Sequence, residues 1–533
     1  MNYIFSKEII VKLKNMKNIR SIFFLTLLLL VGCIQHKKEE ILKVGFGKAN
    51  LTQACIFEDP VPVDQKSMPE NLYVREEKFA ISDRVEGRWR PGSGGIRKLV
   101  DTLYVTAMYG EDQNGPWTII TIDECILSYK QTDNLQYPLI NELGIPKERI
   151  VILPSHGHAT PEMKPEKYQK AVFDAVKQAR ENMSEVETAS LNIKVDSKKY
   201  LINRRIHIDG IGSRTVMFND NCVVHDNYLD ATGHIWDWVK NLGVNPKEYL
   251  DEDKEYITDG EVDDKLQAIF IRNKKSGKLM GSFVRFAAHA VIVSAKVVNG
   301  DVSADFPGYM KRKIEGELGG ITLFGQGPCG DLRPLNKEYS HDFAREYGNR
   351  LADKIIQGYN NLTWLPLTKL EYYTEPVNIP LIENLFLSEE EVETEMEKVE
   401  KLFDQETNPG ERRKLQNKFW RLYRTAVFHD MVRPEWKEKN QLNLFIFAIR
   451  LNDDVIVATQ GEVFTRIGKK MLEPYKANNP VLASMANEYV SYLPTDEERL
   501  KGGYEPSVAI MAPGSPEMLI QSAHKLLNRI YQE

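Results

Sequence analysis

The chain contains few cysteines, and their number and spacing argue against two common uses of the thiol group. Only five of the 533 residues are cysteine: Cys33, Cys55, Cys125, Cys222 and Cys329. So few cysteines in so long a chain do not form a disulfide-dense scaffold. No C-x-x-C spacing occurs, which makes a thiolate zinc site unlikely on sequence grounds. One or two bridges among the last four cysteines are compatible with the sequence, which does not fix their pairing.

A basic excess is also missing. The chain has 70 lysine and arginine residues against 76 aspartate and glutamate residues, and its net charge is −6. This balance argues against a nucleic-acid partner. The sequence shows no internal repeat and no low-complexity block. Its length allows one large domain or two to three ordinary ones.

Hydrophobic runs are short, and the most prominent lies near the N-terminus. The apolar segment 22–31 follows four basic residues and is too short to span a bilayer comfortably. A basic region followed by a short apolar core is typical of an export signal. The alternative interpretation is a short transmembrane anchor.

The end of this segment, Leu30-Val-Gly-Cys33, resembles the lipobox of bacterial lipoproteins. The resemblance implies that residues 1–33 form a signal peptide ending at a lipidated Cys33, and residues 34–42 form a tether. We therefore expect an exported bacterial lipoprotein, periplasmic or at the cell surface, held on the membrane by an N-terminal lipid anchor.

Residues 43–533 are expected to form one α/β domain, with mixed sheets and flanking helices. Strand–helix–strand periodicity is clearest between Ser282 and Phe324, where a helix ends at Gly319-Gly320. The patterns further predict a first strand at 42–52 that close-set glycines interrupt, a hairpin from 99–109 and 116–123, a helix at 137–143, a strand at 149–154, and helices at 165–180 and 516–531.

The pattern changes between residues 388 and 431. Ser388 is a good N-cap before a run of glutamates, which favours a helix that runs to Asp404. Asn408-Pro-Gly interrupts the pattern, and residues 411–429 predict a second helix. We interpret the segment as a helical hairpin inserted into the α/β body, with its charges on a solvated face.

Chemically useful side chains follow several predicted strands. His156 and His158 come directly after the strand at 149–154, His289 ends another strand, and Glu462 ends a third. Each has an ordinary explanation: two histidines in a surface loop, a buried histidine with satisfied hydrogen bonds, and a capping carboxylate. Their shared position at strand ends nevertheless suggests that they converge. Two histidines, a carboxylate and an open position match the habit of catalytic zinc.

The chain resembles the N-terminal catalytic domain of the neutral/alkaline ceramidase family. The motifs that carry the resemblance occur in the expected order over nearly all of the chain after the signal. They are Val44-Gly-Phe-Gly-Lys-Ala-Asn-Leu-Thr, Ser155-His-Gly-His158, Asn203-Arg204, Phe286-Ala-Ala-His289, Ser303-Ala-Asp-Phe-Pro-Gly-Tyr, Gln326-Gly-Pro-Cys-Gly-Asp331 with Pro334, Gly461-Glu462 and Gly503-Tyr504-Glu505.

The resemblance implies a zinc-dependent hydrolase that cleaves an N-acyl amide bond of a small or lipid-like substrate. It implies that Zn²⁺ is bound by four residues: His156, His289, Glu462 and Tyr504. It further implies that His158 acts as the acid and base, and that Arg204 stabilises the oxyanion. Tyr504 could instead be a half-buried strand aromatic.

The chain departs from the family at Asp331-Leu332-Arg333-Pro334, where Arg333 stands in the place of the family's serine. We expect Asp331 and Arg333 to contact substrate, and an arginine there suits a carboxylate, sulfate or phosphate group. The chain also ends without the immunoglobulin-like C-terminal domain of full ceramidases. Two alternative functions stay open: a surface-tethered binding protein without turnover, and an esterase or glycan-related hydrolase.

Overall fold

The fold is described from a computed structural model, which describes residues 42–55, 98–161, 163–294, 301–473 and 479–532. The predicted signal segment 1–33 with Cys33, and the predicted tether up to residue 41, lie outside the described residues. Within the described ranges, no helix combines the length and the apolar character that crossing a membrane requires.

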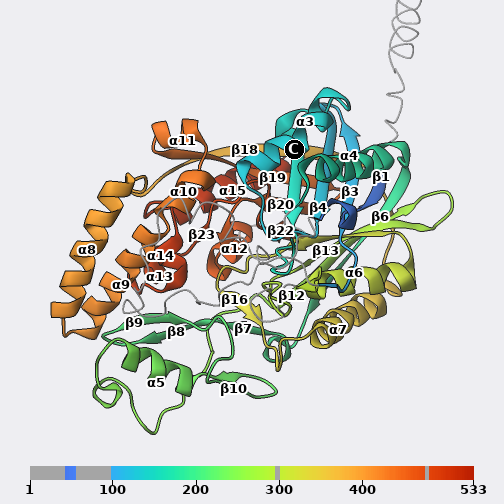
Figure 1. The fold of residues 1–533 in the computed structure, drawn as a ribbon. Helices are drawn as coiled ribbons and strands as arrows, with labels where there is room; N and C mark the ends of the chain where they lie inside the picture. The colour runs from blue at the N-terminus through green and yellow to red at the C-terminus, as the bar shows by residue number, and fades with distance from the viewer. Residues whose placement is uncertain (1–41, 56–97, 162, 295–300, 474–478, 533) are drawn as a thin grey trace, which may run out of the picture. The chain divides into compact units, whose positions relative to one another are not determined.

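The first of the two main sheets is large and mixed (Figure 1). In the described part of the chain it has nine strands in the order β15-β13-β12-β6-β1-β3-β4-β5, with β17 also paired to β6. Their bounds are β1 (Lys43–Asn50), β3 (Tyr104–Asp112), β4 (Gly115–Ile122), β5 (Ile150–Pro154), β6 (Ser184–Lys194), β12 (Lys265–Asn273), β13 (Leu279–Phe286), β15 (Ile321–Gln326) and β17 (Leu365–Pro366). The pairs β4–β5 and β13–β15 are parallel.

A second sheet packs against one face of the first. Its strands are β18 (Leu370–Pro380), β19 (Gln441–Leu451), β20 (Asp454–Thr459) and β22 (Asn479–Ala483). The interface between the sheets is a buried apolar cluster in which Trp117 and Phe283 of the first sheet join Phe447 and Ile456 of the second. Burial of such large side chains is the main stabilising contribution of this layer.

Helices cover the outer faces of both sheets (Figure 1). The first sheet is covered by α3 (Tyr129–Asn141), α4 (Pro165–Glu181), α6 (Asp305–Leu318) and α7 (His341–Tyr359). The second sheet is covered by α12 (Thr465–Leu472) and α15 (Ser515–Gln532). The predicted α/β class with mixed sheets and flanking helices is confirmed.

Most local predictions are confirmed, and two need correction. The helix expected at 137–143 is α3, which begins earlier because Ser128 forms a capping box with Gln131. The first strand is not interrupted by its glycines, since β1 is continuous from Lys43 to Asn50. The strand β5, the helix α4 and the unit β13–α6–β15 lie where the patterns place them, and the predicted hairpin forms from β3 and β4, with its first strand at Tyr104–Asp112.

The glycines of β1 serve helix packing. A Cβ atom added to Gly45 or Gly47 would overlap the carbonyl oxygen of Ala179 or Ala175 in α4. Only a residue without a side chain lets the backbone of α4 approach the strand so closely.

We expect Gly47→Ala to lower the free energy of unfolding by about 3 kcal/mol, because the added methyl group forces α4 away from the sheet. Denaturant titration measures this loss. Gly316→Ala in α6 is the control for the loss of glycine itself, since nothing lies within 4 Å of an added Cβ there and its backbone does not need a positive φ. A Gly47→Ala variant as stable as the wild type would contradict this close packing.

The predicted insertion is helical, as expected, but its second helix is divided. α8 (Glu389–Gln405) begins at the Ser388 capping box, and α9 (Pro409–Tyr423) follows Asn408. The chain then turns at Arg424 into α10 (Thr425–Met431) and α11 (Pro434–Glu438). α8 and α9 share a small apolar core of their own.

Short elements connect these layers and position the site. They are β7 (Leu201–Asn203), β8 (Arg205–Ile208), β9 (Gly212–Thr215), β16 (Leu332–Pro334), β21 (Glu462–Val463), β23 (Tyr492–Leu493) and α14 (Tyr504–Val508). The remaining elements are β2 (Lys98–Leu99), β10 (Val223–Val224), β11 (Leu229–Asp230), β14 (Asp301–Val302), α5 (Thr232–Asn241) and α13 (Asp496–Leu500).

The first sheet curls, so that its edge strand β15 approaches β4. Phe324 N in β15 donates a hydrogen bond of 3.4 Å to Thr121 Oγ1 in β4. The segments that follow β5 and β13 consequently meet, and His158 N donates a 3.1 Å hydrogen bond to the carbonyl oxygen of Ala290. This closure brings together side chains that lie at opposite ends of the strand order.

A buried carboxyl in the second sheet should make stability depend on pH. Asp454 is 7% exposed, and burial raises its pKa from 3.8 to about 6. Because the pKa in the folded state is higher than in the unfolded state, proton binding by Asp454 stabilises the folded state. This stabilisation is fully present below about pH 4 and is lost as the pH rises through about 6. Asp454→Asn should therefore lose less stability than the wild type over this range. Denaturant titrations at each pH test this, and parallel curves would contradict it.

Candidate metal centre

His156 is the first histidine of the site and lies just beyond the end of β5. Its backbone has a φ of 62°, a conformation that residues other than glycine seldom adopt. The side chain is 1% exposed, and Nδ1 lies 2.9 Å from the carbonyl oxygen of Cys125. Because a carbonyl oxygen can only accept, Nδ1 carries a proton, which leaves Nε2 as the nitrogen that can bind a metal ion.

His289 follows β13 and is held in the same way. Its Nδ1 donates to the carbonyl oxygen of Leu332 at 2.9 Å, and the side chain is 1% exposed. Burial lowers the pKa of His289 to about 4. The ring is therefore neutral near pH 7, and its Nε2 lone pair points toward the rest of the site.

Glu462 joins the two histidines. Its Oε2 lies 2.8 Å from His289 Nε2 and 3.4 Å from His156 Nε2. Burial raises the pKa of Glu462, but its interactions with His156 and His289 outweigh that effect and hold the pKa well below its usual range. The group is thus an ionised carboxylate. On its other side, Oε1 accepts a hydrogen bond of 2.7 Å from the Tyr489 hydroxyl.

This donor set fits a metal ion. Two unprotonated ring nitrogens and a carboxylate oxygen repel one another at these distances unless a proton or a cation lies between them. Each imidazole is oriented by a backbone carbonyl, and the carboxylate is oriented by a tyrosine, which is the outer-shell support that metal ligands have. Their positions at strand ends led us to expect that His156, His289 and Glu462 converge. The structure brings these three residues together.

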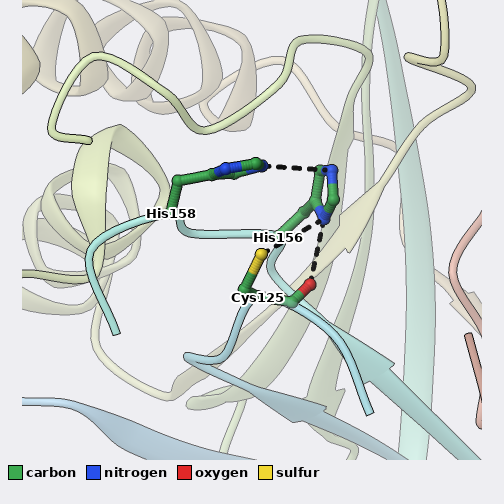
Figure 2. A group of neighbouring side chains, drawn as sticks. All are labelled: Cys125, His156 and His158. Atoms are coloured by element: carbon green, nitrogen blue, oxygen red, sulfur yellow. Dashed lines mark hydrogen bonds between the residues drawn. The ribbon is translucent and has the colours of Figure 1, made fainter. Parts of the chain in front are cut away.

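His158 lies beside His156, as Figure 2 shows. Its Nε2 is 3.4 Å from His156 Nε2. Burial, followed by the neighbouring His156 and His289, lowers the pKa of His158 well below its usual range. A neutral imidazole at this place can accept a proton.

Two buried thiols also adjoin the histidines. Cys125 Sγ lies 4.0 Å from His156 Nδ1 (Figure 2). Potential metal-binding atoms lie within 4.8 Å of one another in two groups, Cys125 with His156 and His158, and Cys329 with His156 and His289. In the described part of the chain, Cys55, Cys125, Cys222 and Cys329 are all free thiols, so the bridges that the sequence left open are not formed.

Arg204 approaches the site from the turn between β7 and β8. Its Nε lies 2.9 Å from Glu505 Oε1, and its Nη2 donates to Gly330 O at 2.8 Å and to the Tyr492 hydroxyl at 3.2 Å. Burial lowers the pKa of Arg204, but Tyr492 and the carboxylates of Glu505 and Glu462 outweigh this effect and raise the pKa above its usual value. The guanidinium therefore stays charged. The site thus contains a fixed cation.

The expected contact of Tyr504 with the metal stays a prediction. Tyr504 begins α14, its hydroxyl accepts a 3.3 Å hydrogen bond from Arg424, and its ring contacts that of Tyr492 at a centroid distance of 5.7 Å. Two other tyrosines contact the carboxylate residue: Tyr489 donates to Glu462, and the backbone of Tyr492 pairs with Glu462 between β21 and β23. Sequence reasoning missed both, because only the pairing of β23 with β21 brings them to the site.

Asp331 serves the structure of the loops around the site. Its Oδ1 accepts hydrogen bonds from the Thr465 amide and hydroxyl at 2.8 and 2.7 Å, and its Oδ2 accepts one from Asn203 at 3.0 Å. These bonds connect the loop after β15 with the start of α12 and with β7. The expected contact of Asp331 with substrate stays a prediction.

Arg333 also makes contacts inside the fold. The side chain is 1% exposed, and its guanidinium donates to Val216 O, Asn336 Oδ1 and Asn219 Oδ1 at 3.0, 2.9 and 2.7 Å. Alternate residues of β16 face opposite sides, so Arg333 points to these acceptors. Its donors are used inside the fold, and the expected contact with an anionic substrate stays a prediction.

We therefore expect Arg333→Ser to lower the free energy of unfolding by about 3 kcal/mol, because it leaves buried acceptors unpaired. The ratio of activities toward anionic and neutral amides should change less than about twofold, which is small beside the tenfold change that 1.4 kcal/mol would produce. Thermal unfolding and paired substrate assays measure the two effects. A large shift in selectivity with unchanged stability would indicate that Arg333 contacts the substrate.

Comparison with known proteins adds solved structures of similar fold. The crystal structure of neutral ceramidase from Pseudomonas aeruginosa aligns with a TM-score of 0.56 and 14% identity, over 91% of this chain and 73% of that chain. A ceramidase complexed with C2 aligns with a TM-score of 0.53 and 14% identity, over 91% of this chain and 74% of that chain. No protein-family model and no curated protein matches the chain. The described residues therefore have a ceramidase-like fold.

Proposed function

We propose that this protein is a zinc-dependent hydrolase that cleaves the amide bond of an N-acyl substrate. The observation that carries the proposal is the convergence of two imidazoles, each oriented by a backbone carbonyl, and an ionised carboxylate, His156, His289 and Glu462, in a buried site beside a fixed cation. The ceramidases of similar fold support the amide bond as the target.

The donor set fits zinc, because zinc prefers imidazole nitrogen and carboxylate oxygen and leaves a coordination position open in catalytic sites. When bound in such a site, zinc polarises an acyl carbonyl and makes water acidic enough to attack near neutral pH. His156, His289 and Glu462 would hold it. The carbonyls of Cys125 and Leu332 keep the two rings in the required tautomer.

His158 and Arg204 would carry the remaining chemistry. A neutral His158 can take a proton during attack and return it to the leaving nitrogen. Arg204 can stabilise negative charge that develops on the carbonyl oxygen, since Glu505 and Gly330 hold its guanidinium in place before the reaction begins. The C–N bond breaks as the nitrogen receives this proton, so the nitrogen departs as a neutral amine and the acyl group departs as a carboxylic acid.

Metal analysis of the purified full chain, combined with a panel of N-acyl amides and matched esters, tests this function. We expect about one zinc per chain and amide hydrolysis that a chelator abolishes and added Zn²⁺ restores. Full activity after thorough removal of metal would refute the proposal. Bound metal without turnover of any amide or ester would instead favour a binding protein, and turnover of esters alone would favour an esterase.

We also propose that Cys33 carries a lipid that anchors the protein to the membrane of a bacterial cell, on the exported side. The basic and apolar pattern of residues 12–31 and the lipobox-like Leu30–Cys33 support this. Metabolic labelling with a fatty acid tests it, and a chain that takes up no label would refute it.

A further inference from the structure

Cys329 lies against the two histidines of the candidate metal centre. It belongs to the loop between β15 and β16, and its side chain is 0% exposed. Its sulfur and one ring nitrogen each of His156 and His289 lie within 4.8 Å of one another. A thiol in such a position is one of the softer metal ligands available to a protein.

The charges around the thiol are those of the site itself. The carboxylate of Glu462 and the guanidinium of Arg204 both interact electrostatically with the thiol. The sulfur therefore lies within the field of the same carboxylate and cation that surround the histidines.

Neighbouring groups fix the position of this thiol. Gln326 hydrogen-bonds to it, and Gln326 Oε1, which is fully buried, has no hydrogen-bond partner in the part of the chain that the structure describes. The following residue, Gly330, donates through its amide to Val463 O at 3.0 Å, and a Cβ there would lie 2.6 Å from the carbonyl oxygen of Glu462. The loop therefore packs closely against the strand that carries the carboxylate, and this packing holds Cys329 near the histidines.

We propose that Cys329 is a ligand of the bound metal ion, so that a thiolate joins the imidazoles of His156 and His289 and the carboxylate of Glu462. Binding forms a sulfur–metal bond and releases the thiol proton to solvent. A thiolate favours zinc, cobalt and cadmium over harder ions such as magnesium and manganese. This inference rests on the proposed function, since it requires that the site hold a metal.

Cys125 provides a matched control, because it is a second buried thiol beside the same histidine. Its sulfur lies 4.0 Å from Nδ1 of His156, the nitrogen whose proton is committed to the Cys125 carbonyl oxygen. That nitrogen is on the opposite edge of the ring from a ligating Nε2. We therefore expect Cys125 to take no part in binding the ion.

The test adds Co²⁺ to the metal-free full chain and records its absorption spectrum. A thiolate ligand gives a near-ultraviolet charge-transfer band, which Cys125→Ser should keep and Cys329→Ser should lose. Competition with a chelator should show that Cys329→Ser weakens Co²⁺ binding by about 100-fold. Loss of a residue that only orients a metal ligand costs about 10–100-fold in metal affinity, and loss of a ligand itself should cost at least as much. Cys329→Ala serves if the serine variant does not fold.

The outcomes separate this inference from the proposed function. Visible bands of bound Co²⁺ without a charge-transfer band in the wild type would overturn the thiolate ligand and leave the hydrolase proposal standing. A band that disappears in Cys125→Ser but persists in Cys329→Ser would also overturn it. Failure of the wild type to bind Co²⁺ or Zn²⁺ at all would refute both proposals together.

Discussion

Replacing Glu462 with glutamine is expected to remove the bound metal and to lower kcat/KM for amide hydrolysis by about 10³-fold, which corresponds to about 4 kcal/mol. The change keeps the shape of the side chain but removes its charge. The wild-type carboxylate oxygen lies between two imidazole nitrogens at 2.8 and 3.4 Å. A neutral amide would attract a cation much less strongly from the same place.

The fold of the Glu462→Gln variant should survive. The amide group can donate a hydrogen bond to the lone pair of His289 Nε2, which removes the repulsion that the carboxylate faces without metal. The metal-free variant should therefore melt no lower than the metal-free wild type. Metal analysis, kinetics and thermal unfolding together separate loss of the site from loss of the fold.

Tyr489→Phe is the matched control for this substitution. It removes the hydroxyl that donates to the other oxygen of Glu462 at 2.7 Å but leaves the carboxylate itself. We expect metal affinity to fall by about 10–100-fold and activity to return at high Zn²⁺ concentration. A Glu462→Gln variant that retains metal and rate would disprove the assignment of Glu462 as a ligand.

The second large effect is expected for Arg204→Lys, which should lower kcat by about 10²–10³-fold and change KM only a few-fold. Lysine keeps the charge but cannot reproduce contacts made through both Nε and Nη2 of the guanidinium. The ammonium group would not be held toward the substrate by Glu505 and Gly330 together. The metal content should stay at the wild-type level.

Arg149→Lys controls for the loss of any buried arginine. Arg149 pairs with Asp112 at 2.7 Å on the β3–β4 hairpin, and its contacts include none of the site residues. This variant should lose stability without losing kcat per folded molecule. Equal kcat values for the two variants would mean that Arg204 supports the fold and does not take part in the reaction.

The sequence predicts the local elements of this protein well, because neighbours along the chain determine them. Ser388 and the glutamates behind it predict the start of α8, and Gly319 predicts the end of α6. Polar residues directly after apolar strands predict that His156, His289 and Glu462 lie at strand ends. None of these inferences requires knowledge of which strands are neighbours in space.

Only the tertiary structure decides which of these strand ends meet. The curl of the first sheet brings the segment after β5 to the segment after β13, and the pairing of β21 with β23 adds Tyr489 and Tyr492. The same long-range packing turns Arg333 inward and places Tyr504 against Arg424. Such contacts join residues far apart in the chain through buried surface and hydrogen bonds, and no local pattern encodes the partner of a buried face.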